Sequence, residues 1–226
     1  MGIKNNIEKF RQGLKPFDAS LIAVSKTHPV AKIKEAYEAG QRAFGENKVQ
    51  ELISKQPLLP TDIEWHLIGH LQRNKVKYIA PFITLVHAVD SLNLLEEINK
   101  QGRKHARTIR CLLQVYIARE ETKFGLDFKE LYEVIQAPEI HSFTNVKIEG
   151  LMGIASLTDN TEQIRDEFRS LKKVFEELKQ RPLPPAIQMK ELSMGMSSDY
   201  EIGLGEGSTL IRIGTAIFGA RGYAQI

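Results

Sequence analysis

Cysteine is almost absent from this chain of 226 residues, because Cys111 is the single example. One cysteine excludes an internal disulfide framework. Its place inside an apolar run, residues 109–117, predicts a small buried hydrophobic side chain in preference to a nucleophile. No stretch approaches the ~20 apolar residues that span a bilayer, and the first ten residues lack the apolar core of a secretion signal. We therefore expect a cytoplasmic protein with no membrane partner.

A marked excess of one charge is also lacking, since 31 Lys and Arg stand against 28 Asp and Glu, a formal net charge of +3. The nearest approach to a basic cluster is Arg73, Lys75 and Lys77, which is too small to neutralise a nucleic-acid backbone. No nucleic-acid partner is therefore expected. With 42% hydrophobic and 26% charged residues, the composition is that of a globular protein and excludes a disordered or fibrous chain.

Short runs rich in β-branched residues alternate with longer segments whose apolar residues recur every three or four positions. This alternation is typical of βαβ units. Strands are predicted over residues 21–26, 43–47, 64–69, 85–90, 109–117, 146–155, 187–192 and 210–214. Helices are predicted over residues 5–13, 30–39, 48–55, 73–80, 92–104, 128–137, 161–180 and 198–204. Asn160 with Gln163 resembles a capping box at the start of the longest helix.

Eight strands that alternate with helices predict an α/β fold, a single (β/α)8 barrel of the TIM type with an extra N-terminal helix. The alternative is an open doubly wound sheet, whose first strand is usually followed by a glycine-rich turn that holds a pyrophosphate. Here that turn, residues 25–29 (SKTHP), contains no glycine, which favours the barrel. No repeat or linker divides the chain, so residues 1–226 are expected to form one domain.

In such a barrel the functional side chains come from the C-terminal ends of the strands. Lys26 ends the first predicted strand, where desolvation favours a neutral amine that can attack a carbonyl as a Schiff base. A lysine that simply extends into solvent is the alternative. Residues 193–197, after the seventh strand, and the Gly214-Thr215 turn after the eighth offer backbone amides and hydroxyls that can surround a phosphate. A phosphate group opposite a Schiff-base lysine describes pyridoxal phosphate (PLP).

The motifs at these strand ends resemble a known family in their residues and in their order. They are residues 23–27 (AVSKT), 44–47 (FGEN), 65–69 (WHLIG), 150–152 (GLM), 192–197 (LSMGMS) with Asp199, and 212–221 (RIGTAIFGAR). From about Leu21 to Arg221 the sequence resembles the pyridoxal phosphate homeostasis proteins. That family is similar to the barrel domain of alanine racemase, and its members bind PLP through a lysine aldimine without an established reaction of their own.

The resemblance implies a set of cofactor-binding residues. It makes Lys26 the aldimine lysine and assigns the phosphate to Ser197, Gly214 and Thr215. It also implies that Arg212 faces the pyridine nitrogen, with Asn47, His66 and Ser193 as the remaining residues of the site. A guanidinium there keeps the nitrogen unprotonated and makes the ring a poor electron sink. Gly153 departs from the pattern, because a bulkier residue or a hydroxyl is expected near the ring.

Three functions remain open at this point. The resemblance implies a non-catalytic carrier for intracellular vitamin B6 homeostasis, expected to be a monomer, with PLP-dependent apo-enzymes as candidate recipients. A PLP-dependent racemase or lyase is the alternative, but racemisation needs bases on both faces of the substrate. Alanine racemase takes one base from an additional domain, for which the seven residues after Gly219 leave no room. Tyr116 is the first residue to consider as a further base. A sugar-phosphate enzyme with Lys26 as Schiff base is the third possibility.

Other polar residues are expected to have structural roles. His66 and His70 are four residues apart, but no carboxylate or cysteine lies at ligand spacing, so no metal site is expected. Glu46 and Asp90 are single carboxylates, and we expect them to anchor loops.

Overall fold

Eight parallel strands close into a barrel in the computed structural model, which describes residues 2–119 and 125–220. The strands follow one another around the ring in chain order, and β1 pairs with β8 with Ser20 opposite Leu210. The strands are β1 (Ser20–Val24), β2 (Ala43–Glu46), β3 (Glu64–Leu67), β4 (Leu85–Val89), β5 (Ile109–Tyr116), β6 (Val146–Ile154), β7 (Ile187–Met196) and β8 (Leu210–Ile213). The predicted (β/α)8 barrel is confirmed.

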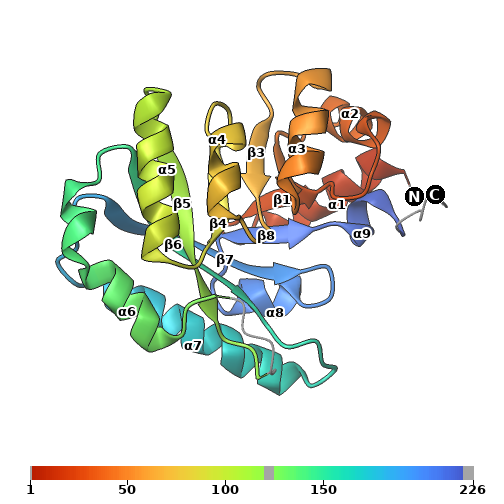
Figure 1. Cartoon of the computed structure of the whole chain (residues 1–226). Coiled ribbons are helices and arrows are strands. Elements are labelled where there is room, and N and C mark those ends of the chain that lie inside the picture. The colour runs from red at the N-terminus through yellow and green to blue at the C-terminus, as the bar shows by residue number, and fades with distance from the viewer. Residues whose placement is uncertain (1, 120–124, 221–226) are drawn as a thin grey trace.

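Helices surround the barrel, and α1, the extra N-terminal helix, lies beside α9 (Figure 1). Asn6 of α1 donates a hydrogen bond to the carbonyl of Ile217 in α9 over 3.0 Å. The helices are α1 (Ile3–Leu14), α2 (Val30–Glu38), α3 (Val49–Lys55), α4 (Val76–Ile79), α5 (Leu92–Lys104), α6 (Phe128–Gln136), α7 (Thr161–Lys179), α8 (Tyr200–Gly205) and α9 (Thr215–Phe218). Short 3-10 helices are η1 (Gln56–Leu58), η2 (Arg73–Lys75) and η3 (Pro138–Ser142). The helix expected over 73–80 is thus divided into η2 and α4, and α9 was not predicted.

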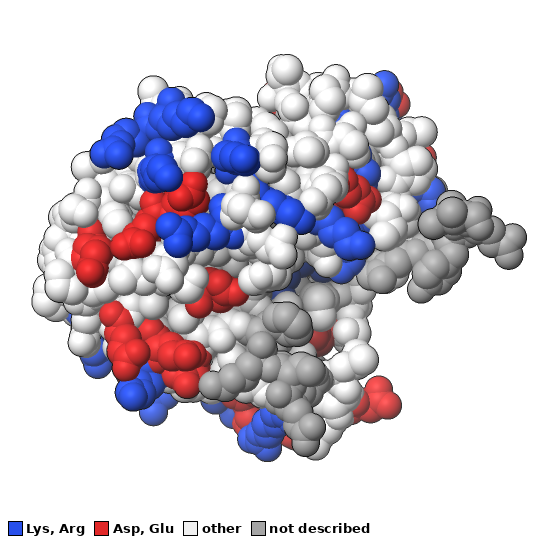
Figure 2. All heavy atoms as spheres, in the orientation of Figure 1, with Lys and Arg blue, Asp and Glu red and all other residues white. Residues whose placement is uncertain are grey.

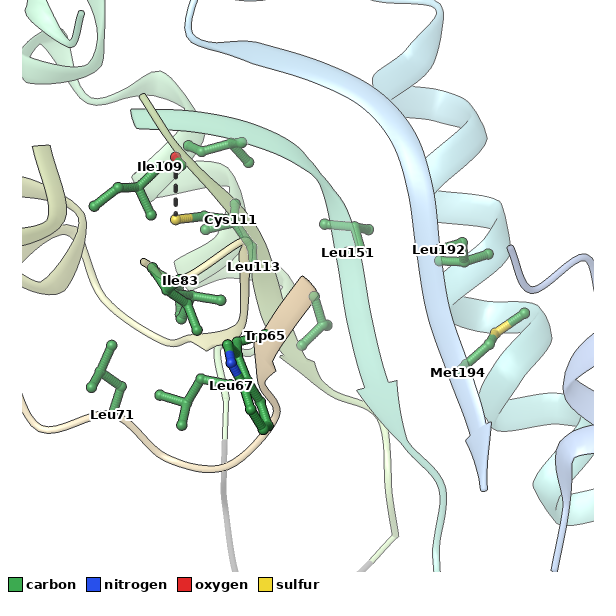
Figure 3. Close-up of a cluster of buried hydrophobic side chains, with 14 of the residues drawn as sticks. Trp65, Leu67, Leu71, Ile83, Ile109, Cys111, Leu113, Leu151, Leu192 and Met194 are labelled. Carbon is green, nitrogen blue, oxygen red and sulfur yellow. Dashed lines mark hydrogen bonds between the residues drawn. The ribbon is translucent and has the colours of Figure 1, made fainter. Parts of the chain in front are cut away.

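The outward faces of the strands form the main core with the helices. Figure 3 shows part of it, including Trp65, Leu113, Leu151 and Met194 from four different strands. Cys111 lies in this cluster and is fully buried, as predicted. Burial raises the pKa of the Cys111 thiol, so it stays protonated and acts as a small apolar side chain.

Two strand ends differ from the sequence prediction at places that matter for the site. β1 ends at Val24, so Lys26 lies in the turn beyond the strand. β7 continues to Met196, and the expectation of a loop beginning at residue 193 is wrong. Its pairing with β8 shifts between Ser193 and Met196, and Gly195 has φ of +91°, a left-handed conformation that glycine adopts without a steric penalty. Periodicity alone does not reveal a strand interrupted in this way.

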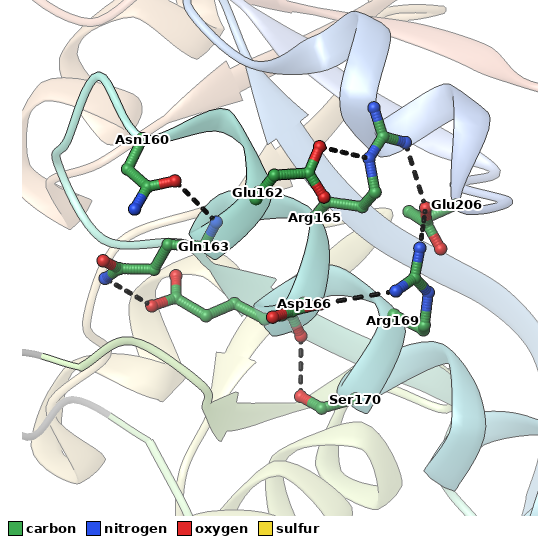
Figure 4. Close-up of polar contacts among 9 residues, drawn as sticks. Asn160, Glu162, Gln163, Arg165, Asp166, Arg169, Ser170 and Glu206 are labelled. Atoms are coloured by element: carbon green, nitrogen blue, oxygen red, sulfur yellow. Dashed lines mark hydrogen bonds and ion pairs between the residues drawn. The ribbon is translucent and has the colours of Figure 1, made fainter.

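Helix α7 is fixed at its start and along one face (Figure 4). The side chain of Asn160 accepts a hydrogen bond from the Gln163 N–H, as the predicted cap requires. The capping box is incomplete, because the Gln163 side chain donates to Glu167 instead of returning to the cap. Arg165 and Arg169 both form ion pairs with Glu206, which ties α7 to the residue that follows α8.

The surface carries charges of both signs. Figure 2 shows Lys and Arg gathered over one end of α5, with acidic side chains close by. Arg73, Lys77 and Lys100 line a shallow depression together with Glu97. Within residues 2–119 and 125–220 no helix is long and apolar enough to cross a membrane. The same part of the chain contains no group of three or more His, Cys, Asp or Glu side chains that could hold a metal ion.

Candidate functional site

A pocket of about 540 Å³ opens where the C-terminal ends of the strands meet. This volume lies within the range of about 300–1,000 Å³ that is usual for small-molecule sites. Six of the eight residues assigned from the sequence line it: Lys26, Asn47, Ser197, Arg212, Gly214 and Thr215. His66 and Ser193 do not line the pocket. Closure of the barrel therefore brings together groups from β1, β2, β7 and β8 that lie far apart in the sequence.

Lys26 lies at one side of the pocket and is half-buried. Its two chain neighbours are both held by the rest of the protein. The Ser25 hydroxyl donates to Glu46 over 2.7 Å, and the Thr27 N–H donates to Glu51 over 2.6 Å. Glu46 thus anchors the loop after β1, as its isolated position in the sequence led us to expect.

Arg212 occupies the floor of the pocket and is only 4% exposed. Its guanidinium donates to the Ser193 hydroxyl over 2.6 Å and to the Gly153 carbonyl over 2.9 Å. Burial lowers the pKa of Arg212 to about 10, and the nearby Asp199 carboxylate opposes this shift. The side chain is still charged at neutral pH, because its pKa remains well above 7.

His66 and Ser193 belong to a polar chain beneath the pocket. His87 joins them, since its Nε2 lies 2.9 Å from Nδ1 of His66 and its Nδ1 lies 3.0 Å from Oγ of Ser193. Burial lowers the pKa of His66 to about 3 and that of His87 well below its usual value. Both rings are therefore neutral at pH 7.

The hydrogen positions in this polar chain depend on the tautomers of the two histidines. Arg212 can only donate, so Ser193 Oγ accepts from it, and the same oxygen can either donate its own hydrogen to Nδ1 of His87 or accept a second one from it. The bond between His87 and His66 then runs in the same direction as the bond between Ser193 and His87. Nε2 of His66 is buried and has no partner among the residues that the structure describes. The chain therefore places Arg212 without adding a charge.

The other side of the pocket is formed by the ends of β7 and β8. The Gly214 N–H donates to the Ser197 hydroxyl over 3.3 Å, which links the two strand ends. Asp199 accepts from the Met196 N–H and fixes the turn that follows β7. Ser197 is half-buried and Thr215 is exposed, so both hydroxyls are accessible to a ligand in the pocket.

A side chain at position 153 would point away from the pocket. A Cβ atom there would lie 2.7 Å from Ile117 and from Leu171, which are core residues outside the barrel wall. A larger residue would have to displace the ends of these two side chains, and the Gly153 carbonyl accepts a hydrogen bond from Arg212. The departure from the family pattern therefore concerns packing behind the strand, and not a contact near the ring.

Several lining residues were not predicted as part of the site. His70 and Asp90 line the pocket and contact each other, with 3.1 Å between Nδ1 and Oδ2. Gln114 of β5 and Ile154 of β6 also line it. Their positions at or after the ends of strands were a usable signal, but no motif in the sequence distinguishes them from other residues there. Tyr116, considered as a further base, is not among the lining residues.

Comparison with known proteins places this chain in a family. Residues 2–222 match the family model described as the alanine racemase N-terminal domain. A pyridoxal phosphate homeostasis protein of Aquifex aeolicus is 41% identical over 91% of this chain and 88% of its own length. One of Escherichia coli K12 is 39% identical over 95% of this chain and 91% of its own. The chain belongs to the pyridoxal phosphate homeostasis protein family. Arg221, which closes the last family motif, lies outside the described residues.

Solved structures that match this chain have the same fold. The structure of PipY from Synechococcus elongatus without PLP matches with a TM-score of 0.89 and 40% identity over 96% of this chain and all of PipY. PipY with PLP bound gives a TM-score of 0.85 at 39% identity over the same shares of both chains. Alanine racemase from Bartonella henselae gives 0.73 at 19% identity over 99% of this chain and 60% of its own, which shows a shared fold.

Proposed function

We propose that this chain binds PLP in the barrel pocket and holds it as an aldimine on Lys26. The observation that carries the proposal is that Lys26, Arg212 and the hydroxyls of Ser197 and Thr215 line one pocket of suitable volume. The amine of Lys26 would add to the aldehyde carbon, the carbonyl oxygen would leave as water, and a C=N bond would remain. PLP is also bound in a PipY structure that is 39% identical to this chain.

The residues present fit the other parts of PLP. We assign the phosphate to Ser197, Gly214 and Thr215, whose hydroxyls and backbone amide can donate to anionic oxygens. We assign Arg212 as the donor to the pyridine nitrogen, and a guanidinium that stays charged does not transfer a proton to it. A ring with an unprotonated nitrogen accepts electrons poorly. This favours storage of the cofactor over catalysis. Asn47 lines the pocket near Lys26, whereas His66 and Ser193 act from below through Arg212.

The proposed role is a non-catalytic PLP carrier in vitamin B6 homeostasis. Its support is that relatives matched over most of their length are named homeostasis proteins. In this proposal, residues 1–226 form one PLP-binding domain that works as a monomer in the cytoplasm. Apo-enzymes that need PLP are the recipients. The bound aldehyde is protected until it is handed over.

Borohydride trapping tests the central claim. After incubation with PLP and reduction, we expect mass spectrometry to find one phosphopyridoxyl group, located on Lys26. Lys26→Ala should abolish this adduct and leave the melting temperature almost unchanged, because the half-buried side chain fills little core volume. Lys34→Ala, at an exposed position of α2, is the matched control and should be labelled like the wild type. A stoichiometric adduct on another lysine in the Lys26→Ala protein would show that Lys26 is wrongly assigned.

A further inference from the structure

Helix α3 holds the turn that carries Lys26 from both sides. The Lys55 ammonium donates to the carbonyl of Ser25, the residue before Lys26, over 2.9 Å. The Glu51 carboxylate accepts from the N–H of Thr27, the residue after it, over 2.6 Å. Glu51 and Lys55 lie one helical turn apart and form an ion pair of 2.6 Å. One pair of helix residues therefore fixes the backbone on each side of Lys26.

The Lys55 ammonium is bound by three oxygens. Besides Ser25 and Glu51 it donates to Oε1 of Glu46, at the end of β2, over 2.8 Å. A lysine has three hydrogens to donate, so all of them are used. The side chain of Lys55 is 7% exposed and that of Glu46 is fully buried. Removal of Lys55 would leave the Glu46 carboxylate buried without its ion-pair partner, which favours keeping Lys55 in this position.

Thr27 shows why the turn needs to be held. Its φ is +66°, in the left-handed region that β-branched residues strongly disfavour. The hydrogen bond from its N–H to Glu51 favours this conformation. Without that acceptor, rotation of Thr27 to a negative φ would relieve the steric strain. That rotation would turn the peptide that joins it to Lys26 and move the lysine side chain relative to the pocket.

We propose that Glu51 and Lys55 are positioning residues that hold the Lys26 turn in the shape from which its amine reaches the carbonyl carbon of the ligand. Neither residue lines the pocket, and they act through the backbone of Ser25 and Thr27. The inference rests on the proposed role of Lys26. It adds that the reactivity of this lysine depends on a helix that does not touch the ligand.

The test separates capture of the aldehyde from occupancy of the pocket. Capture is the rate at which PLP becomes trappable by borohydride on Lys26. Occupancy is the affinity for pyridoxine 5′-phosphate, which has the same ring and phosphate but no aldehyde. We expect Glu51→Ala to slow capture by about tenfold or more, since misplacing a reacting group by ~1 Å can cost about a hundredfold. Its affinity for pyridoxine 5′-phosphate should equal that of the wild type.

The control variant is Glu176→Ala on α7, which breaks an exposed ion pair of the same spacing with Lys172 and should change neither quantity. Glu51→Gln is a milder second variant, because its amide oxygen can still accept from Thr27 but does not compensate the charge of Lys55. It should slow capture in the same direction by a smaller factor. The melting temperature of each variant checks that the barrel is folded.

Thr27→Gly provides the sharper test, because glycine adopts a positive φ without a steric cost. In a Thr27→Gly background the turn depends less on the hydrogen bond to Glu51. Glu51→Ala should therefore slow capture by a smaller factor than in the wild type. An equal loss in both backgrounds, or capture at the wild-type rate in Glu51→Ala, would overturn the inference alone. Wild-type protein that binds pyridoxine 5′-phosphate but never yields a trapped Lys26 adduct would overturn the proposed role of Lys26 as well.

Discussion

Arg212 is positioned by residues beneath the pocket as much as by the strand that carries it. Its bonds to Ser193 and to the Gly153 carbonyl use two of its N–H groups and leave others for a ligand. Ser193 contacts His87, which contacts His66, and burial keeps both rings neutral at pH 7. The protonation state of these histidines is therefore part of the architecture of the site.

This arrangement predicts a pH-dependent stability. The pKa of His66 is about 3 in the folded protein and close to 6.5 in the unfolded chain, so below pH 6.5 the unfolded chain binds a proton that the folded protein does not. The free energy of unfolding should then decrease by up to about 1.4 kcal/mol per pH unit for this residue as the pH falls from 6.5 toward 3. Urea unfolding at several pH values measures the slope.

His66→Gln should reduce that slope between pH 6 and about 4, whatever its effect on stability at pH 7, because a glutamine does not titrate. Replacing the exposed His141 by glutamine is the matched control, and it should leave the slope closer to that of the wild type. Equal slopes in wild type and His66→Gln would contradict the neutral buried histidine.

At the scale of elements, the loops after β2 and β3 approach each other so closely that one of them must contain glycine. A Cβ atom on Gly69 would lie 2.5 Å from the carbonyl oxygen of Asn47, a backbone atom that cannot move independently. Both residues line the pocket, so this contact sets the position of its wall.

Gly69→Ala should therefore lower both the melting temperature and the affinity for pyridoxine 5′-phosphate, because the Asn47 loop must move away. Gly13→Ala is the control, since a Cβ at this position in α1 meets no atom within 4 Å. It should stabilise the protein by about 0.5–1 kcal/mol through the higher helix propensity of alanine. Thermal unfolding and a fluorescence titration measure both effects. Unchanged affinity in Gly69→Ala would mean that the loop adapts without consequence for the pocket.

At the scale of the whole molecule, the proposed carrier role makes a prediction about catalysis. In the proposed binding mode Arg212 donates to the pyridine nitrogen and the ring is a poor electron sink, so deprotonation of an amino acid bound there should be slow. When PLP-loaded protein is incubated with L-alanine in deuterium oxide, we expect α-proton exchange far slower than the ~1 s⁻¹ of ordinary enzymes. NMR follows the exchange, and chiral analysis follows the configuration.

Exchange at enzyme-like rates would favour a racemase or lyase over a carrier. The contact between His70 and Asp90 at the pocket wall would then be the first place to look for the base, because a carboxylate can orient an imidazole for proton transfer. Tyr116 does not line the pocket, so its position at the end of β5 is not sufficient for that role. His70→Gln would identify the base by loss of exchange without loss of PLP.

The sequence by itself determined the type of fold and most of the pocket. Alternation of strand and helix periods predicts βαβ units, and a barrel places every strand end at one rim, so Lys26, Ser197, Gly214 and Thr215 were expected together at one site. The resemblance to the family added Asn47 and Arg212, and all six residues line the pocket. The first four follow from local pattern and from a connection rule. They do not require knowledge of which atoms touch.

Only the tertiary structure decided the depth and the partners of each side chain. His66 and Ser193 lie below the pocket because the level of an inward side chain depends on strand register, and β7 shifts register around Gly195. The hydrogen bonds of Glu51 and Lys55 to the turn around Lys26 were also absent from the sequence prediction. Such contacts join segments that closure of the barrel brings close together in space. Hydrophobic periodicity carries no information about the distance between those segments.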